Sequence, residues 1–243
     1  GEGYIETFYN ATGAIFEHAQ ALSALVAFIE HRYYGNGTSI PDTSTMRYLT
    51  VEQSMADFAW FIKKYRQKLQ CNSDECPIVT FGGSYGGMLV TWFRQKYPQL
   101  TVGGIAASAP IDFYQNTGVQ VKFWNATLDT FEKFGTPKCV PDYLNALAHM
   151  RDLAVWPEGR KKLASQLASC DPLVNETTTV AKIDFYLKGA MASLAMLDYP
   201  VAQSFVTPLP ANPVRESCKR LQQEVDPIDG LRSMVDLFLN FTG

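Results

Sequence analysis

The sequence lacks the features that mark several large classes of protein. No apolar run reaches the roughly 18 residues that a membrane-spanning helix needs, and the longest, residues 19–29, contains Gln20 and Ser23. Basic residues do not outnumber acidic ones (21 against 24), so no charge excess marks a nucleic-acid-binding surface. Global disorder is excluded as well, because 47% of the 243 residues are hydrophobic and can form a sizeable core.

The spacing typical of metal sites is also absent. The five cysteines include no CxxC pair and no neighbouring histidine, so we predict no metal site, and we expect no cofactor. They are Cys71, Cys76, Cys139, Cys170 and Cys218. Cys71 and Cys76 bracket a short polar turn and are spaced to close a small local loop. In an oxidising compartment, the odd number predicts one disulfide partner outside these residues.

The two ends of the sequence predict a piece of a longer protein. It begins at Gly1 without an initiator Met or a signal-type segment, and it stops soon after an apolar helical run. The odd number of cysteines agrees with this expectation.

Five Asn-x-Thr sequons indicate the secretory pathway. They are at Asn10, Asn36, Asn125, Asn175 and Asn240. One or two would occur by chance, whereas five favour a glycoprotein whose modified asparagines lie at the surface. The alternative, that the sequons are unused, stays open.

The first 110 residues alternate in the manner of an α/β protein. The apolar run at 24–29 is typical of a buried parallel strand. Thr50 and Gln53 form a capping-box pattern that opens a helix with one apolar stripe. The expected elements are, in order, a strand at 24–29, a helix from Thr50 to Leu69, a strand at 77–81, a helix at 86–97 and a strand at 102–107. This alternation predicts a parallel sheet with right-handed crossovers.

After Pro110 the pattern becomes helical. The helices are expected near 119–134, 142–154, 158–169, 177–197 and 214–241, with breaks at Pro137, Pro141, Pro157, Pro172 and 207–213. No strand is predicted in this part. The simplest interpretation is a helical insertion that follows an α/β core.

The residues that favour catalysis lie in the segment PIVTFGGSYGG. Ser84 stands in a G-x-S-x-G motif with Gly82 and Gly86, directly after a predicted strand and before a predicted helix. In a nucleophile elbow the serine is strained, and glycines two residues away let the strand and helix approach. The helix N-terminus favours negative charge there, and the backbone N–H of Tyr85 is the expected oxyanion donor. The alternative is a glycine-rich structural or nucleotide-binding turn, which the flanking pattern disfavours.

A serine nucleophile needs a general base, which is usually a histidine held by a carboxylate. The sequence has three histidines, His18, His31 and His149. His18 and His31 precede Ser84, against the Ser–acid–His order of elbow enzymes, and His149 lies on a predicted helix without an obvious acid. We expect all three to be structural, which leaves the nucleophile without a base among them.

Six segments form a specific combination over nearly the whole chain. They are EHRYYG (30–35), LTVEQSMADFAWFI (49–62), FGGSYGGMLVTWFRQKYP (81–98), AASAP (106–110), LAMLDYP (194–200) and PLPANPV (208–214). Together they resemble the lysosomal prolyl carboxypeptidase and dipeptidyl peptidase II family of serine peptidases. The PLPANP stretch and TPKC at 136–139 are more similar to the dipeptidyl peptidase II branch.

The resemblance implies a fold and a division of the chain. An α/β-hydrolase core, partial here, is expected in residues 1–110, and an inserted helical cap domain in 111–243. The triad Asp and His are expected beyond residue 243. A cap disulfide is implied between Cys139 and Cys218, whereas Cys170 is expected to pair with a cysteine after the present end.

The resemblance also implies a chemistry, which is acyl transfer by Ser84 in a serine exopeptidase that cleaves after proline or alanine near a peptide terminus. The second oxyanion donor is expected near Gly3, beside that of Tyr85. Glu2 is a candidate partner for a substrate amine, unless it only orders its loop. Met88, one turn after Ser84, is a candidate for an apolar proline pocket, unless it only packs the core. Release of N-terminal dipeptides is favoured over Pro-X carboxypeptidase activity.

Peptides with proline near one end are the expected partners, and the expected location is lysosomal or secreted. We predict no nucleic-acid partner and no membrane span, and the resemblance allows a homodimer. Two other classes stay open. A lipase or esterase would use the same elbow with another cap, and a non-catalytic binding glycoprotein would keep the fold alone.

Overall fold

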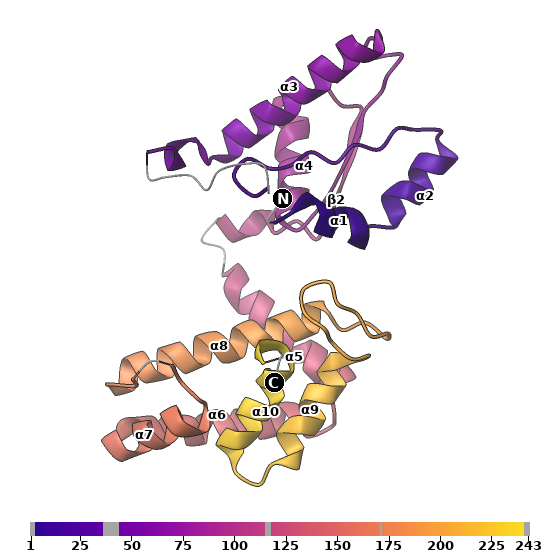
Figure 1. Cartoon of the computed structure of the whole chain (residues 1–243). Helices are drawn as coiled ribbons and strands as arrows, with labels where there is room; N and C mark the ends of the chain where they lie inside the picture. The colour runs from indigo at the N-terminus through magenta and orange to yellow at the C-terminus, as the bar shows by residue number, and fades with distance from the viewer. Residues whose placement is uncertain (1–2, 36–43, 115–117, 171, 241–243) are drawn as a thin grey trace. The chain divides into compact units, whose positions relative to one another are not determined.

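The protein is described by a computed structural model that covers residues 3–35, 44–114, 118–170 and 172–240. Glu2 and Asn36 therefore lie outside the described residues. The chain divides into two compact units, residues 1–117 and 118–243 (Figure 1).

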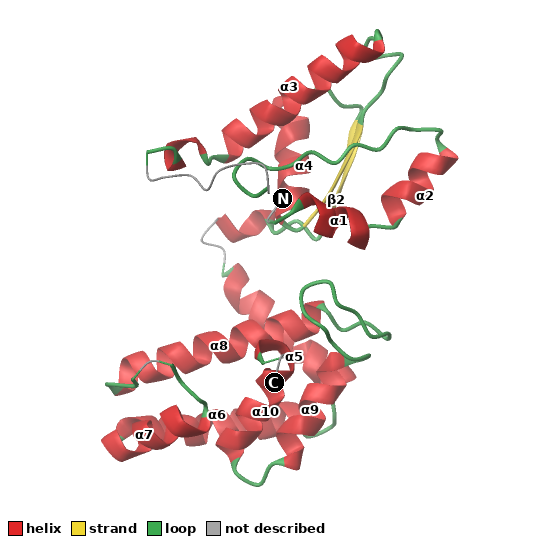
Figure 2. Ribbon diagram, in the orientation of Figure 1, coloured by secondary structure: helices red, strands yellow, loops and turns green. Residues whose placement is uncertain are grey.

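The first unit contains helices around a small sheet (Figure 2). Its elements are α1 (Ile5–Ala11), α2 (Ala14–Ala21), the 3-10 helix η1 (Met46–Tyr48), α3 (Val51–Leu69), β1 (Val79–Gly83), α4 (Tyr85–Lys96), β2 (Gly103–Ala107) and the 3-10 helix η2 (Ile111–Tyr114). The predicted strand–helix–strand order from residue 77 to 107 is confirmed, although β1 begins and ends two residues later than expected.

The sheet consists, within the described residues, of β1 and β2 in parallel. The pairing runs from Val79 opposite Gly103 to Gly83 opposite Ala107, and α4 is the crossover. Helix α4 covers the face on which Gly104 stands, because a side chain there would meet Val90 of α4. A β-carbon at Gly104 would lie only 2.5 Å from the Val90 methyl group, so glycine permits this close packing.

Helix α3 begins as the capping-box pattern predicts. The hydroxyl of Thr50 accepts a hydrogen bond from the backbone N–H of Gln53 at 3.2 Å, which satisfies one of the first-turn donors. Its apolar stripe packs against α4 and the loop that follows it. The core of this unit consists of Met55, Ala59, Ile62, Leu89, Phe93 and Leu100.

The strand predicted at residues 24–29 is wrong. The segment forms no strand, and the side chain of Leu25 is 67% exposed. Phe28 instead joins an aromatic cluster with α1 and α2, where its ring centroid lies 5.5 Å from Tyr9 and 5.9 Å from Phe16. A strand requires a hydrogen-bonded neighbour in a sheet, and β1 pairs only with β2 in the described part of the chain.

The second unit is helical. Its helices are α5 (Val119–Phe134), α6 (Cys139–Val155), α7 (Pro157–Gln166), α8 (Glu176–Met196), α9 (Pro213–Gln223) and α10 (Pro227–Leu239). Of strand structure, its described residues hold only an isolated bridge between Gln203 and Leu209, in agreement with the prediction. No helix in the described ranges is long and apolar enough to cross a membrane.

Two helix boundaries differ from the prediction because of proline. The single helix expected at 214–241 is two helices, since Pro227 occupies the first turn of α10 and the Asp226 carboxylate caps it, accepting from the N–H of Ile228 at 2.8 Å. Pro141 does not separate helices as expected. It lies in the first turn of α6, where the missing N–H would have had no intrahelical acceptor.

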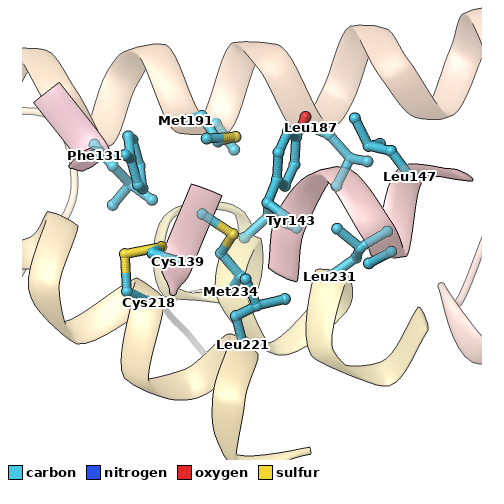
Figure 3. Packing of buried hydrophobic residues seen from close by; sticks show 14 of the residues in the cluster. Phe131, Cys139, Tyr143, Leu147, Leu187, Met191, Cys218, Leu221, Leu231 and Met234 are labelled. Carbon is cyan, nitrogen blue, oxygen red and sulfur yellow. A yellow bond between two sulfur atoms is a disulfide. The ribbon is translucent and has the colours of Figure 1, made fainter. Parts of the chain in front are cut away.

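The core of the second unit surrounds the disulfide between Cys139 and Cys218, which joins α6 to α9 (Figure 3). Both cysteines are almost fully buried, at 1% and 0% exposure. Figure 3 shows the aromatic rings of Phe131 and Tyr143 among aliphatic side chains from α8 and α10. The disulfide therefore cross-links the middle of the packed interior of this unit.

Candidate active site

Ser84 stands at the turn between β1 and α4. Its backbone has φ 53° and ψ −124°, a conformation that L-residues rarely adopt. Two backbone hydrogen bonds hold it there: its N–H donates to the carbonyl of Ala107 at 3.0 Å, and its carbonyl accepts from Met88 at 3.1 Å. The residue itself is exposed. This strained and exposed conformation is the one that a nucleophile elbow requires of its serine.

The close approach of strand and helix depends on Gly82 and Gly87. A β-carbon at Gly82 would lie 2.2 Å from the carbonyl oxygen of Gly86, and one at Gly87 would lie 3.0 Å from the carbonyl oxygen of Ala107. A β-carbon at Gly86 would meet no atom within 4 Å. The steric requirement expected at Gly86 is therefore found at its neighbour Gly87.

We expect Gly82→Ala to destabilise the first unit strongly. The new methyl group would collide with backbone rather than with a flexible side chain, and we expect a loss of roughly 3 kcal/mol or more in the free energy of unfolding. Gly86→Ala is the matched control, and in a helix this exchange is neutral or stabilising by up to about 1 kcal/mol. Thermal unfolding of the full-length variants measures both, and equal midpoints would contradict the steric argument.

The two predicted oxyanion donors, Tyr85 and the segment around Gly3, lie at different places in the first unit. Tyr85 is the first residue of α4, so its backbone N–H lies at the positive end of that helix, next to Ser84. Gly3 is half-buried and precedes α1, while Glu2 lies outside the described residues. Met88 is only 4% exposed, which favours core packing over a pocket wall in this structure.

His31 is buried, at 3% exposure, and its two ring nitrogens both have partners. Nδ1 lies 2.9 Å from the carbonyl oxygen of Arg32, and Nε2 lies 3.1 Å from the hydroxyl of Tyr85. A carbonyl only accepts, so Nδ1 carries the hydrogen, and in the neutral ring Nε2 accepts from Tyr85. Burial lowers the pKa of His31, which favours this neutral form. Its Nε2 is thus engaged by Tyr85 and is not positioned as a base for Ser84.

The other two histidines are also not assigned as the base. His18 is exposed on α2 and stacks on Phe81 of β1 with ring centroids 6.1 Å apart. His149 lies on α6 of the second unit. The hydrogen bonds of His31 and the stacking of His18 give these two rings structural contacts, and a structural role for His149 stays a prediction.

An ion pair between Arg32 and Asp57 is a feature that the sequence analysis did not single out. The guanidinium binds the carboxylate of Asp57 in a bidentate manner, with two contacts of 2.7 Å, and also donates to the carbonyl of Tyr48 at 2.9 Å. The pair joins the segment after His31 to α3, and the hydrogen bond to Asp57 raises the pKa of Arg32. Arg32 lies in the segment 30–35 and Asp57 in the segment 49–62, both of which carry the family resemblance. That resemblance is the only sequence signal that points to the pair.

The sequon asparagines that the structure describes all lie at the surface. Asn10, Asn125, Asn175 and Asn240 are exposed. Asn175 also caps α8, since its side-chain oxygen accepts from the backbone N–H of Thr178 at 2.9 Å. Exposure meets the first physical requirement for a glycan at each of these positions.

The cysteines form two disulfides, Cys71–Cys76 and Cys139–Cys218, and Cys170 is exposed and unpaired within the described residues. Among those residues no group of three or more His, Cys, Asp or Glu side chains is arranged to hold a metal ion.

Comparison with known proteins gives a consistent result. Residues 1–241 match the family described as serine carboxypeptidase S28. The chain is 35% identical to the lysosomal Pro-X carboxypeptidase of Homo sapiens over 226 residues, which cover 91% of this chain and 45% of that protein. The Mus musculus protein of the same name is 34% identical over 100% of this chain and 50% of its own length. A Caenorhabditis elegans protein, prolyl carboxy peptidase like protein 5, is 32% identical with the same two shares. The chain thus spans about half the length of these relatives.

Proposed function

The chain belongs to the serine carboxypeptidase S28 family, and from this premise we propose that Ser84 is the nucleophile of a serine exopeptidase that cleaves after proline. The observation that carries the proposal is the backbone of Ser84, whose positive φ between β1 and α4 matches the demand of a nucleophile elbow. In this proposal residues 1–110 are part of an α/β-hydrolase core, and residues 111–243 belong to a helical cap.

The reaction is acyl transfer in two steps. A base accepts the Ser84 proton as the serine oxygen attacks the carbonyl carbon of proline. The protonated base then gives its proton to the leaving nitrogen as the C–N bond breaks, which leaves an ester on Ser84. Water then hydrolyses the ester and restores the hydroxyl. The negative oxygen of each tetrahedral intermediate is held by the N–H of Tyr85 and by a donor near Gly3, each worth about 3–4 kcal/mol. The base is not assigned among His18, His31 and His149.

The direction of cleavage is the finer part of the proposal. The TPKC and PLPANP segments favour release of N-terminal dipeptides, whereas the names of the relatives, which are Pro-X carboxypeptidases, favour removal of a residue after a penultimate proline. We give the second direction more weight, because the relatives match across the chain and the two segments are short. Either enzyme acts on peptides with proline near one end, and a lysosomal or secreted location suits the disulfides and sequons.

Activity on three substrate types tests the proposal in the full-length protein. The panel contains peptides that end in Pro-X, peptides that begin with X-Pro and have a blocked C-terminus, and short acyl esters. We expect the first to be cleaved fastest and a fluorophosphonate probe to label Ser84. Fastest cleavage of the second would select the dipeptidyl direction, and activity on esters alone would select a lipase or esterase. Absence of both labelling and cleavage would overturn the proposal and leave a binding glycoprotein.

A further inference from the structure

A side-chain hydrogen bond connects the nucleophile elbow to a segment more than 50 residues earlier in the chain. The hydroxyl of Tyr85, the residue that follows Ser84, lies 3.1 Å from Nε2 of His31. The bond reaches Tyr85 at the start of α4, where the backbone has just passed through the strained conformation of Ser84. It therefore acts on the residue whose N–H is the proposed oxyanion donor.

The direction of this bond follows from the other side of the ring. The Arg32 carbonyl takes the hydrogen of Nδ1, so Nε2 is left as an acceptor and Tyr85 is the donor. A buried acceptor that loses its donor is destabilising, so this hydrogen bond favours the observed position of the Tyr85 hydroxyl. The neutral His31 ring therefore has one acceptor nitrogen, Nε2, and the hydroxyl of Tyr85 donates to it.

His31 is itself held firmly. Its ring packs edge-on against Tyr34, with centroids 5.0 Å apart, and against Phe58 of α3 at 6.4 Å. The next residue, Arg32, is clamped to α3 by its bidentate pair with Asp57. Charge-assisted bidentate pairs fix orientation as well as distance. The acceptor offered to Tyr85 is consequently part of a rigid frame built on α3.

The strain at Ser84 explains why such a frame matters. A residue in this region of φ and ψ is strained, and the conformation persists only when several surrounding contacts restrain it. Two of the restraints are backbone hydrogen bonds, from Ser84 to Ala107 and from Met88 to Ser84. The bond between His31 and Tyr85 is a restraint from side chains, so mutation can remove it without changing the backbone.

We infer that His31 is a positioning residue that acts through the Tyr85 hydroxyl to hold the Tyr85 backbone N–H where the oxyanion forms. The inference rests on the proposed function, because it deepens the role given to Tyr85. His31 touches neither substrate nor Ser84 in this account. Its contribution is to keep the donor in place during the reaction, when a small displacement weakens a hydrogen bond to developing charge.

Three variants of the full-length protein test the inference. Tyr85→Phe removes only the hydroxyl, and His31→Asn keeps a donor for Arg32 but does not reach Tyr85. Each should lower kcat about tenfold with little change in KM, because an indirect displacement costs less than the 10²- to 10³-fold loss of a whole donor. His31→Gln places an amide oxygen near the position of Nε2 and should recover most of the loss.

Tyr34→Phe is the matched control. It makes the same chemical change on a ring that packs against the same histidine, and it should leave kcat within about twofold of the wild type. A merely structural role for His31 would give a different pattern, in which His31→Gln and His31→Asn are equally impaired and the loss follows their melting temperatures. If His31→Asn fails to fold, Tyr85→Phe decides the matter alone.

Failure of the proposed function and failure of the role given to His31 would produce different experimental results. A wild-type protein that is neither labelled by a fluorophosphonate nor able to cleave the substrate panel would overturn the proposed function, and the inference would fall with it. A labelled and active wild type, with Tyr85→Phe at full kcat, would overturn the inference alone. A loss confined to KM would also overturn it, because oxyanion stabilisation acts in the transition state.

Discussion

Ser84→Ala should abolish hydrolysis of the preferred substrate, with a fall in kcat of about 10⁴- to 10⁶-fold. Both steps of the proposed reaction require the serine oxygen, which forms the ester in the first step and is released from it when water attacks in the second. What remains would be the contribution of the oxyanion donors and of substrate binding. The measurement is single-turnover hydrolysis by the full-length variant, with a fluorophosphonate probe to confirm the missing nucleophile.

The fold should survive this change. Ser84 is exposed, and the two hydrogen bonds that define its conformation come from its backbone. Its thermal midpoint should stay close to that of the wild type. Ser193→Ala on α8 is a control of the same chemistry, because it removes a hydroxyl that bonds only locally, to the carbonyl of Gly189 at 2.9 Å. Full activity in Ser84→Ala would refute the assignment of the nucleophile.

Removal of the Cys139–Cys218 disulfide should be the most destabilising change in the helical unit. The bridge closes a loop with a sequence separation of 79, and the chain-entropy relation gives about 4–5 kcal/mol for that length. The two sulfur atoms also lie in the packed core, so Cys139→Ala with Cys218→Ala leaves a cavity as well. Thermal unfolding followed by circular dichroism would measure the loss.

The other disulfide provides the matched comparison. Cys71 and Cys76 have a sequence separation of 5, for which the same relation gives about 2 kcal/mol. They also lie in a polar surface turn, so Cys71→Ala with Cys76→Ala removes little packing. An equal drop in melting temperature for the two double variants would show that neither loop length nor burial controls the effect.

The elbow was predictable because its causes are local. A strand, a sharp turn and a helix within residues 79–96 follow from an apolar run, four closely spaced glycines and a helical stripe. The sequence motif did not identify correctly which glycines are sterically required, because Gly86 has room for a side chain while Gly82 and Gly87 do not. The sequence motif points to Gly82 and Gly86, whereas the contact distances show that the tight positions are Gly82 and Gly87.

The incorrect prediction of a strand at 24–29 shows that a short hydrophobic pattern does not by itself identify a strand. A short apolar run satisfies a buried strand and an extended segment equally well, because both place alternate side chains on opposite sides. The structure resolves the ambiguity through Phe28, which packs with Tyr9 and Phe16 rather than in a sheet. The division of 214–241 into α9 and α10 has a local cause. Asp226 followed by Pro227 is a typical start of a helix, and this pair marks the boundary in the sequence.

The sequence by itself determined the strand–turn–helix around Ser84, the helical character of the second unit and the family. These depend on turn sterics and on side-chain periodicity, which act over a few residues. Only the tertiary structure decided which groups His31 contacts, because its partner Tyr85 lies 54 residues away and its acceptor nitrogen is defined by the carbonyl of Arg32. Contacts of that range arise when α3, α4 and the segment after residue 30 pack together, and no short pattern encodes them.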